Sequence, residues 1–141
     1  MGFSISASTA IIGVAILMTL EVSMGTVIPV LTDLDESYDD MRQRTLDELQ
    51  TSIVISNITV QANASLHDLS IKVDNTGSTV IDSNYVHVLI DGVLSSFTSS
   101  ESYWFPEQLV TLSVYGVSGS GSKIVKVVTN NGISDYKSYI A

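Results

Sequence analysis

An uncharged run at the start of the chain limits its possible folds more than any other feature. No side chain in residues 3–20 carries a charge, and most of these residues are apolar or small. Eighteen residues of helix span about 27 Å, close to the hydrocarbon thickness of a bilayer. Glu21 interrupts the run, residues 22–31 continue it, and we expect Pro29 to kink or end the helix.

The run admits three interpretations. A cleaved secretion signal would have a shorter apolar region behind a basic start. Ser23-Met24-Gly25 resembles a cleavage site, but no Lys or Arg precedes Arg42. A buried helix of a soluble domain would need a larger domain around it than residues 53–141 provide. We therefore expect residues 1–31 to form a retained transmembrane helix, with the short N-terminal end inside and the rest of the chain outside.

Small residues recur along one face of this helix. Ser6 and Ala10 have small-xxx-small spacing, and so do Thr9 and Gly13. Such residues let helix backbones approach closely in lipid, which makes these four candidates for helix packing. Small residues also occur in anchors by chance, so both interpretations stay open.

Residues 32–52 form an acidic segment with apolar residues at helical spacing, which predicts a helical stalk. Acidic residues near its start would suit the helix dipole, and Thr32 or Asp33 would cap it. The apolar stripe, which includes Leu34, Tyr38 and Met41, could form a short coiled coil or pack on the chain's own domain. The charged residues are expected to be solvated.

From Ile53 the apolar period changes to two, which is typical of strands. Turn signals at residues 75–77, 91–92 and 131–132, and a Gly/Ser-rich segment at 116–122, divide residues 53–141 into about seven or eight short strands. This pattern predicts an all-β C-terminal domain, an immunoglobulin-like β-sandwich without a cysteine pair. We expect its turn at residues 75–77 to contain a residue at positive φ.

The composition excludes several function classes. The formal net charge of −9 makes nucleic acid an improbable partner, and the absence of cysteine excludes thiolate chemistry. His67 and His87 are isolated, and no nucleophile elbow or phosphate loop is present. We expect no catalytic, cofactor or metal site, and hence no enzyme. Asn57 and Asn63 match the glycosylation pattern, which only permits a sugar outside the cell.

Three consecutive aromatic residues, Tyr103, Trp104 and Phe105, stand just before a predicted strand. One or two of them are expected to enter the core, and any that stays exposed is a candidate partner-binding residue.

Five stretches of the sequence carry a family resemblance: MGFSISASTAII at 1–12, SYDDMRQR at 37–44, VDNTGSTVIDSNYVHVLIDG at 73–92, WFPEQLVTL at 104–112 and KIVKVVTNNGISDY at 123–136. In these stretches, which follow one another in order, the chain resembles the FlaF-type accessory proteins of the archaellum, the archaeal flagellum. Glu107-Gln108 departs from the resemblance, because Gly-Glu is expected there.

The resemblance implies a non-enzymatic stator component at the archaellum base. It implies a single-pass anchor in the archaeal cytoplasmic membrane and a β-sandwich outside it, in the pseudoperiplasm. It further implies binding to the surface-layer protein, a FlaG-type partner protein and self-association, most simply as a dimer. The alternative is a structural subunit of an archaellum or type IV pilus-like filament. Such subunits carry a basic leader, which is missing before Arg42.

Overall fold

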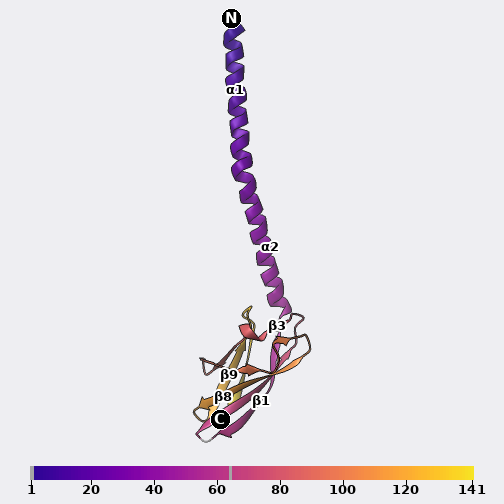
Figure 1. The fold of residues 1–141 in the computed structure, drawn as a ribbon, viewed down its shortest axis with the longest axis vertical. Coiled ribbons are helices and arrows are strands. Elements are labelled where there is room, and N and C mark those ends of the chain that lie inside the picture. Colours follow the sequence, from indigo (N-terminus) through magenta and orange to yellow (C-terminus); the bar gives the residue numbers. More distant parts are fainter. Residues whose placement is uncertain (1, 64) are drawn as a thin grey trace. The chain divides into compact units, whose positions relative to one another are not determined.

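The structure is a computed structural model that describes residues 2–63 and 65–141. Its contacts divide the chain into two units, Met1–Gln43 and Arg44–Ala141. The chain combines a long N-terminal helical segment with an all-β domain, as the sequence predicts. Figure 1 colours the helical segment indigo to violet and the β-domain magenta to yellow.

The helical segment does not end at Pro29. Helix α1 (Gly2–Val22) leads through a π-helical turn, η1 (Ser23–Val27), into α2 (Ile28–Gln50). The wider π turn directly precedes Pro29, whose ring would clash with the carbonyl one turn earlier in a regular α-helix. The expected helix end at Pro29 is therefore wrong, and so is the expected cap at Thr32 or Asp33, since both cap candidates lie inside α2.

Two antiparallel four-stranded sheets form the sandwich. The first has the order β1-β2-β8-β6 and the second the order β10-β9-β4-β5, while β3 and β7 form a separate pair. The strands are β1 (Ile53–Asn63), β2 (Leu66–Asn75), β3 (Ile81–Asp82), β4 (His87–Ile90), β5 (Val93–Ser95), β6 (Thr98–Ser99), β7 (Tyr103–Trp104), β8 (Leu109–Ser118), β9 (Ser122–Val128) and β10 (Ser134–Ile140). A short 3-10 helix, η2 (Ser83–Tyr85), precedes β4.

The core lies between the two sheets and follows from the period of two. Alternate residues of the strands point inward, and nearly all of them are β-branched or otherwise apolar. Ile71 and Val73 from β2 meet Val125 and Val127 from β9 in one buried cluster, and all four are fully buried.

Several predicted turns differ from the observed ones. The positive-φ residues do not include Gly77, so the expectation for residues 75–77 is wrong. β8 extends three residues, 116–118, into the Gly/Ser-rich segment at 116–122 expected to separate two strands. The hairpins at Asp91-Gly92 and Asn131-Gly132 are confirmed.

The side chains of β10 close one side of the sandwich. A bulge interrupts the register of β1 between Ile55 and Asn57. Asp135 accepts a hydrogen bond from the amide of Ile55 at 2.7 Å, and Lys137 donates to the carbonyl of Ser56 at 2.6 Å. These bonds satisfy backbone groups that the bulge frees, and they tie β10 to β1.

Within the second unit, the last turn of α2 is bonded to the β-domain. We call Asp47, Thr51, Thr79 and Asn131 the junction. The Asn131 amide donates to the Thr51 hydroxyl at 2.7 Å and to the Asp47 carbonyl at 3.2 Å. The Thr51 and Thr79 hydroxyls lie 2.7 Å apart. The end of the helix is thus held by several polar contacts from two separate loops.

Gly77 is required at this place because of close packing and not because of its φ angle. A Cβ atom at Gly77 would lie 2.5 Å from both the Gln50 carbonyl oxygen and the Ser52 amide nitrogen. The next residue, Ser78, donates its amide proton to the same Gln50 carbonyl at 2.8 Å. The loop after β2 therefore packs directly against the helix end.

The departure at Glu107 falls on a strained backbone position. Residues 105–108 form a turn in which the Gln108 amide donates to the Phe105 carbonyl at 3.1 Å, and Glu107 has a φ of 62°. With Pro106 before it, this is the third position of a type II turn, which favours glycine. Glu107 therefore adopts a backbone conformation that favours the glycine expected here from the resemblance.

Replacing Glu107 with Gly should raise the free energy of unfolding by about 0.5–1 kcal/mol, because relief of the left-handed strain exceeds the entropy that glycine adds to the unfolded chain. Thermal unfolding of the full-length chain in detergent, followed by the fluorescence of its single Trp, measures this change. Glu101→Gly, at a position without positive φ, is the control and should not stabilise. Equal destabilisation by both variants would contradict the strain argument.

Candidate interaction surfaces

The potential ligands and titratable groups of the described residues are scattered. Within residues 2–63 and 65–141, no three His, Asp or Glu side chains gather closely enough to share a metal ion. His67 is buried, and its Nε2 lies 3.0 Å from the Tyr139 hydroxyl, across the two sheets. Burial raises the pKa of Tyr139. His87 is exposed on β4. The surfaces that remain are those for contact with other molecules.

The three aromatic candidates separate into core and surface. Trp104 is fully buried, and its indole nitrogen lies 3.4 Å from the Ser99 hydroxyl. Tyr103 and Phe105 are more than half exposed. Because neighbouring residues of a strand point to opposite faces, Trp104 fixes the other two side chains on the outside. Only Tyr103 and Phe105 thus remain available as candidate partner-binding residues.

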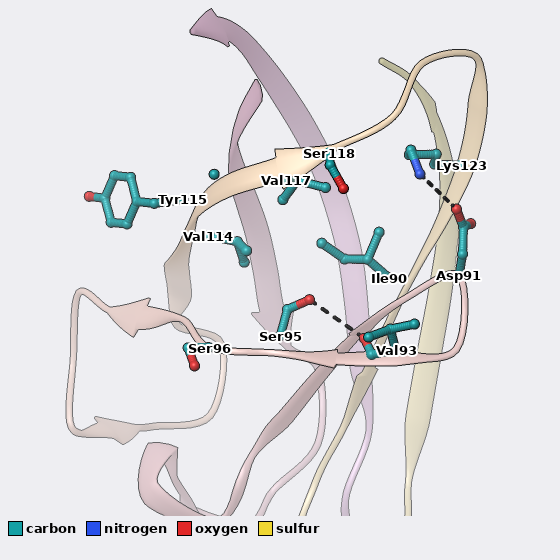
Figure 2. Close-up of a pocket in the computed structure, with 11 residues that line it drawn as sticks. Ile90, Asp91, Val93, Ser95, Ser96, Val114, Tyr115, Val117, Ser118 and Lys123 are labelled. Atoms are coloured by element: carbon teal, nitrogen blue, oxygen red, sulfur yellow. Dashed lines mark hydrogen bonds and ion pairs between the residues drawn. The ribbon is translucent and has the colours of Figure 1, made fainter. Parts of the chain in front are cut away.

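An open groove of about 430 Å³ lies between the two sheets on the side opposite the β1–β10 contact. Figure 2 shows Ile90, Val114 and Val117 lining it, while the ring of Tyr115 extends away. The groove is open because β6 pairs with β8 only at Leu112 and Ser113. Its walls are β5 on one sheet and the end of β8 on the other.

An ion pair closes one end of this groove. The Lys123 ammonium lies 3.0 Å from the Asp91 carboxylate, and the amide of Ile124 donates to the same carboxylate at 2.9 Å. The Ile124 amide and the Lys123 ammonium together lower the pKa of Asp91. Asp91 has a positive φ in the turn between β4 and β5, and its carboxylate ties this turn to β9.

The helical segment carries the candidate packing residues on an exposed surface. Thr9 donates its hydroxyl proton to the Ile5 carbonyl at 2.9 Å, one turn earlier. Space around Gly13 is open, and a Cβ there would meet no atom within 4 Å. Ser6 and Ala10 are exposed as well. All four residues are therefore accessible to another helix, and the Thr9 hydroxyl is satisfied without water, as lipid requires.

The helical segment is long and apolar enough to cross a membrane. A window within Ser4–Gln50 has a mean hydropathy of 2.1, and none of that window is buried inside the structure. Length and composition are thus compatible with a membrane anchor.

Comparisons with known proteins find similarity among solved structures. No protein-family model and no curated protein matches the chain. Among solved structures, it is similar to the archaellum periplasmic stator protein FlaG from Sulfolobus acidocaldarius. The TM-score is 0.50 and the identity 20%, and the match covers 63% of this chain and 99% of that one. It is also similar to a chain of the archaellum periplasmic stator complex of FlaF and FlaG from that archaeon, with a TM-score of 0.48 and 19% identity over 62% and 87% of the two chains. At such identities the likeness to FlaG shows a shared fold.

Proposed function

We propose that the chain is a non-enzymatic stator component of an archaellum motor, of the FlaF type. The residues that resemble FlaF-type proteins support this proposal, and so does a fold shared with a protein described as an archaellum stator. In this proposal residues 1–31 cross the archaeal cytoplasmic membrane once, with residues 32–141 outside. Its partners are the surface-layer protein, a FlaG-type subunit and a second copy of the chain.

The observation that carries the proposal is the direct bonding of the helix end to the sandwich. A stator must resist torque, so its anchor and its grip on the envelope have to be joined stiffly. The junction residues Thr51 and Asn131 hold the carbonyl of Asp47 in the last turn of α2. From there the chain enters β1, which pairs with β2 over ten residue positions. Such a connection transmits force, whereas a flexible linker would absorb it.

A filament subunit is the alternative, and the location of the mature chain separates the two functions. We expect mass spectrometry to find the chain in the membrane fraction with an uncut apolar segment, because that segment is the anchor. Sheared and purified filaments should lack it, while the filament protein itself serves as the positive control. Recovery of the chain as a major filament component, cut before the apolar run, would contradict the stator proposal.

A further inference from the structure

The outer face of the sheet β10-β9-β4-β5 is unusually apolar for an exposed surface. Register places Tyr136, Lys126, Leu89 and Leu94 in one row across all four strands. Tyr136 is 71% exposed and Leu94 65%. Neighbouring rows add further side chains on the same face. We call this set the apolar face: His87, Leu89, Leu94, Ile124, Lys126, Val128 and Tyr136, with Ser134 and Ser138 of the edge strand β10 beside it.

The outer face of the other sheet provides an internal comparison. The equivalent row across β1-β2-β8-β6 is hydroxylic, and the next row is polar. A solvated sandwich face normally has this polar character. Farther along that face Val54 and Leu109 are partly exposed, so the contrast lies in the central rows. It makes the apolar face a candidate contact surface. The two polar rows are Thr59, Ser70, Ser113 and Thr98, and Asn57, Lys72 and Thr111.

Lys126, at the centre of the apolar face, is its charged side chain, and the described outward positions of these four strands hold no Asp or Glu. Asp135, on β10, points the other way and bonds β1. The nearest turn carboxylate, Asp91, is already engaged by Lys123. In a chain of net charge −9, this face is a cationic exception.

A depression borders the apolar face next to Leu94. It has a volume of about 350 Å³ and is lined by His87, Leu94, Ser95, Ser96 and Phe97. A side chain from another molecule can enter it beside the exposed row. The face thus combines a flat apolar centre, one central ammonium and one recess, which are features of a protein–protein contact.

We propose that the apolar face binds a protein other than this chain, through apolar side chains that surround a carboxylate placed opposite Lys126. Charge complementarity selects this occupant, because an acidic group would neutralise Lys126 on burial. A second copy docking by the same face is disfavoured. A twofold contact brings a face against itself, so two central Lys126 side chains would approach without a carboxylate between them.

This assignment explains how force can leave the sandwich. β10 lies at the edge of the sheet that carries the apolar face, and Asp135 and Lys137 tie it to β1. β1 directly follows the junction. A partner held on the apolar face is therefore connected to the helix through β10 and β1, without passing through the open groove.

The inference rests on the proposed function, and the experiment tests the two separately. Full-length chain in detergent is titrated with two purified probes from the same cells, the surface-layer protein and the FlaG-type subunit. Lys126→Glu should weaken whichever probe binds by at least about tenfold, because it places like charges in contact. Lys72→Glu is the matched control, since Lys72 has the equivalent central position on the polar face, and it should change affinity less than about twofold.

Equal weakening by both variants, or none by Lys126→Glu, would overturn the assignment of the face. Binding of neither probe to the unaltered chain would count against the proposed partners instead. In that case thiol labelling tests whether another molecule covers the apolar face. The chain has no native cysteine, so an introduced cysteine is the only one labelled. Ser138→Cys, beside Ile124 on the apolar face, is compared with Ser113→Cys on the polar face.

Each variant is labelled with a maleimide in intact cell membranes and again after purification in detergent. We expect the membrane environment to protect Ser138→Cys at least about fivefold more than Ser113→Cys, since a partner covers only the apolar face. Equal labelling ratios would refute the proposal. So would thiol cross-linking of Ser138→Cys only to a second copy, because that result would make the occupant this chain itself.

Discussion

Replacing Asn75 with Asp should lower the free energy of unfolding of the sandwich by about 3–5 kcal/mol at pH 7, although the two side chains have almost the same shape. Asn75 is fully buried, and its amide nitrogen donates to the carbonyls of Thr79 at 2.8 Å and Trp104 at 3.0 Å. Its side-chain oxygen accepts from the amide of Gly77 at 3.1 Å. A carboxylate would remove both of these hydrogen bonds and face the two carbonyls with a negative charge.

The loss should depend on pH. Burial and the two carbonyls would raise the pKa of the introduced carboxyl in the folded state above its value of about 3.9 in the unfolded chain. Below both pKa values the carboxyl is protonated in either state, so only the loss of a donor remains. As the pH rises through the interval between the two values, the unfolded state gains stability first, and the variant weakens relative to the unaltered chain.

Trp104 gives a direct measurement, because it is the single Trp of the chain and is fully buried. Denaturant unfolding of the full-length protein in detergent is followed by the fluorescence of Trp104 at pH 7 and at pH 4. The two curves give the loss in free energy of unfolding and its dependence on pH. Asn130→Asp, which adds the same charge at an exposed position in the β9–β10 turn, should change stability by less than about 0.5 kcal/mol. A pH-independent loss, or one as small as that of the control, would contradict the described role of Asn75.

Local patterns predict the architecture well because both halves of the chain have clear periods. The uncharged run and the apolar spacing of residues 32–50 give a helix, and the alternation after Ile53 gives β1, β2, β8, β9 and β10. The two- and three-residue strands β3, β5, β6 and β7 are too short to show a period. Their positions depend on pairing with distant residues, such as Ile81 with Trp104.

The details that sequence reasoning missed depend on tertiary packing. Gly77 gives the signal of a turn with positive φ, but the helix end beside it is what excludes a side chain. Pro29 gives the signal of a helix break, but a π turn accommodates it. In both cases the residue type was informative, and its neighbours in space decided the outcome.

The apolar face could not be predicted from the sequence for a related reason. Residues 86–90 are mostly apolar, so both faces of β4 look like core faces. Val88 turns out to be fully buried and Leu89 to lie on the outside. The sequence did contain one indication of this face. Ile124, Lys126 and Tyr136 stand at alternate positions of their strands, between residues that point toward the core or toward a neighbouring strand. Only the register shows that they form one row with Leu89 and Leu94.

Under the proposed stator function, making the stalk flexible should abolish swimming without releasing the chain from the membrane. Substitution of residues 34–40 by Gly and Ser would convert about two turns of α2 into a coil. The altered segment has to end before Arg44, because the Asp47 carbonyl is bonded to Thr51 and Asn131 in the second unit. The sandwich and the apolar helix α1 then keep all their own contacts.

A helical replacement separates stiffness from side-chain recognition. In this control the acidic residues of 34–40 are kept, and Leu34, Ser37 and Tyr38 become Ala, a strong helix former. Cells with the control should swim at nearly the normal speed, and cells with the Gly/Ser segment should not swim, while fractionation finds both chains in the membrane. Normal swimming with the Gly/Ser segment would show that a tether suffices. Loss of swimming in both would show that the side chains of the stripe, and not the stiffness of the helix, carry the function.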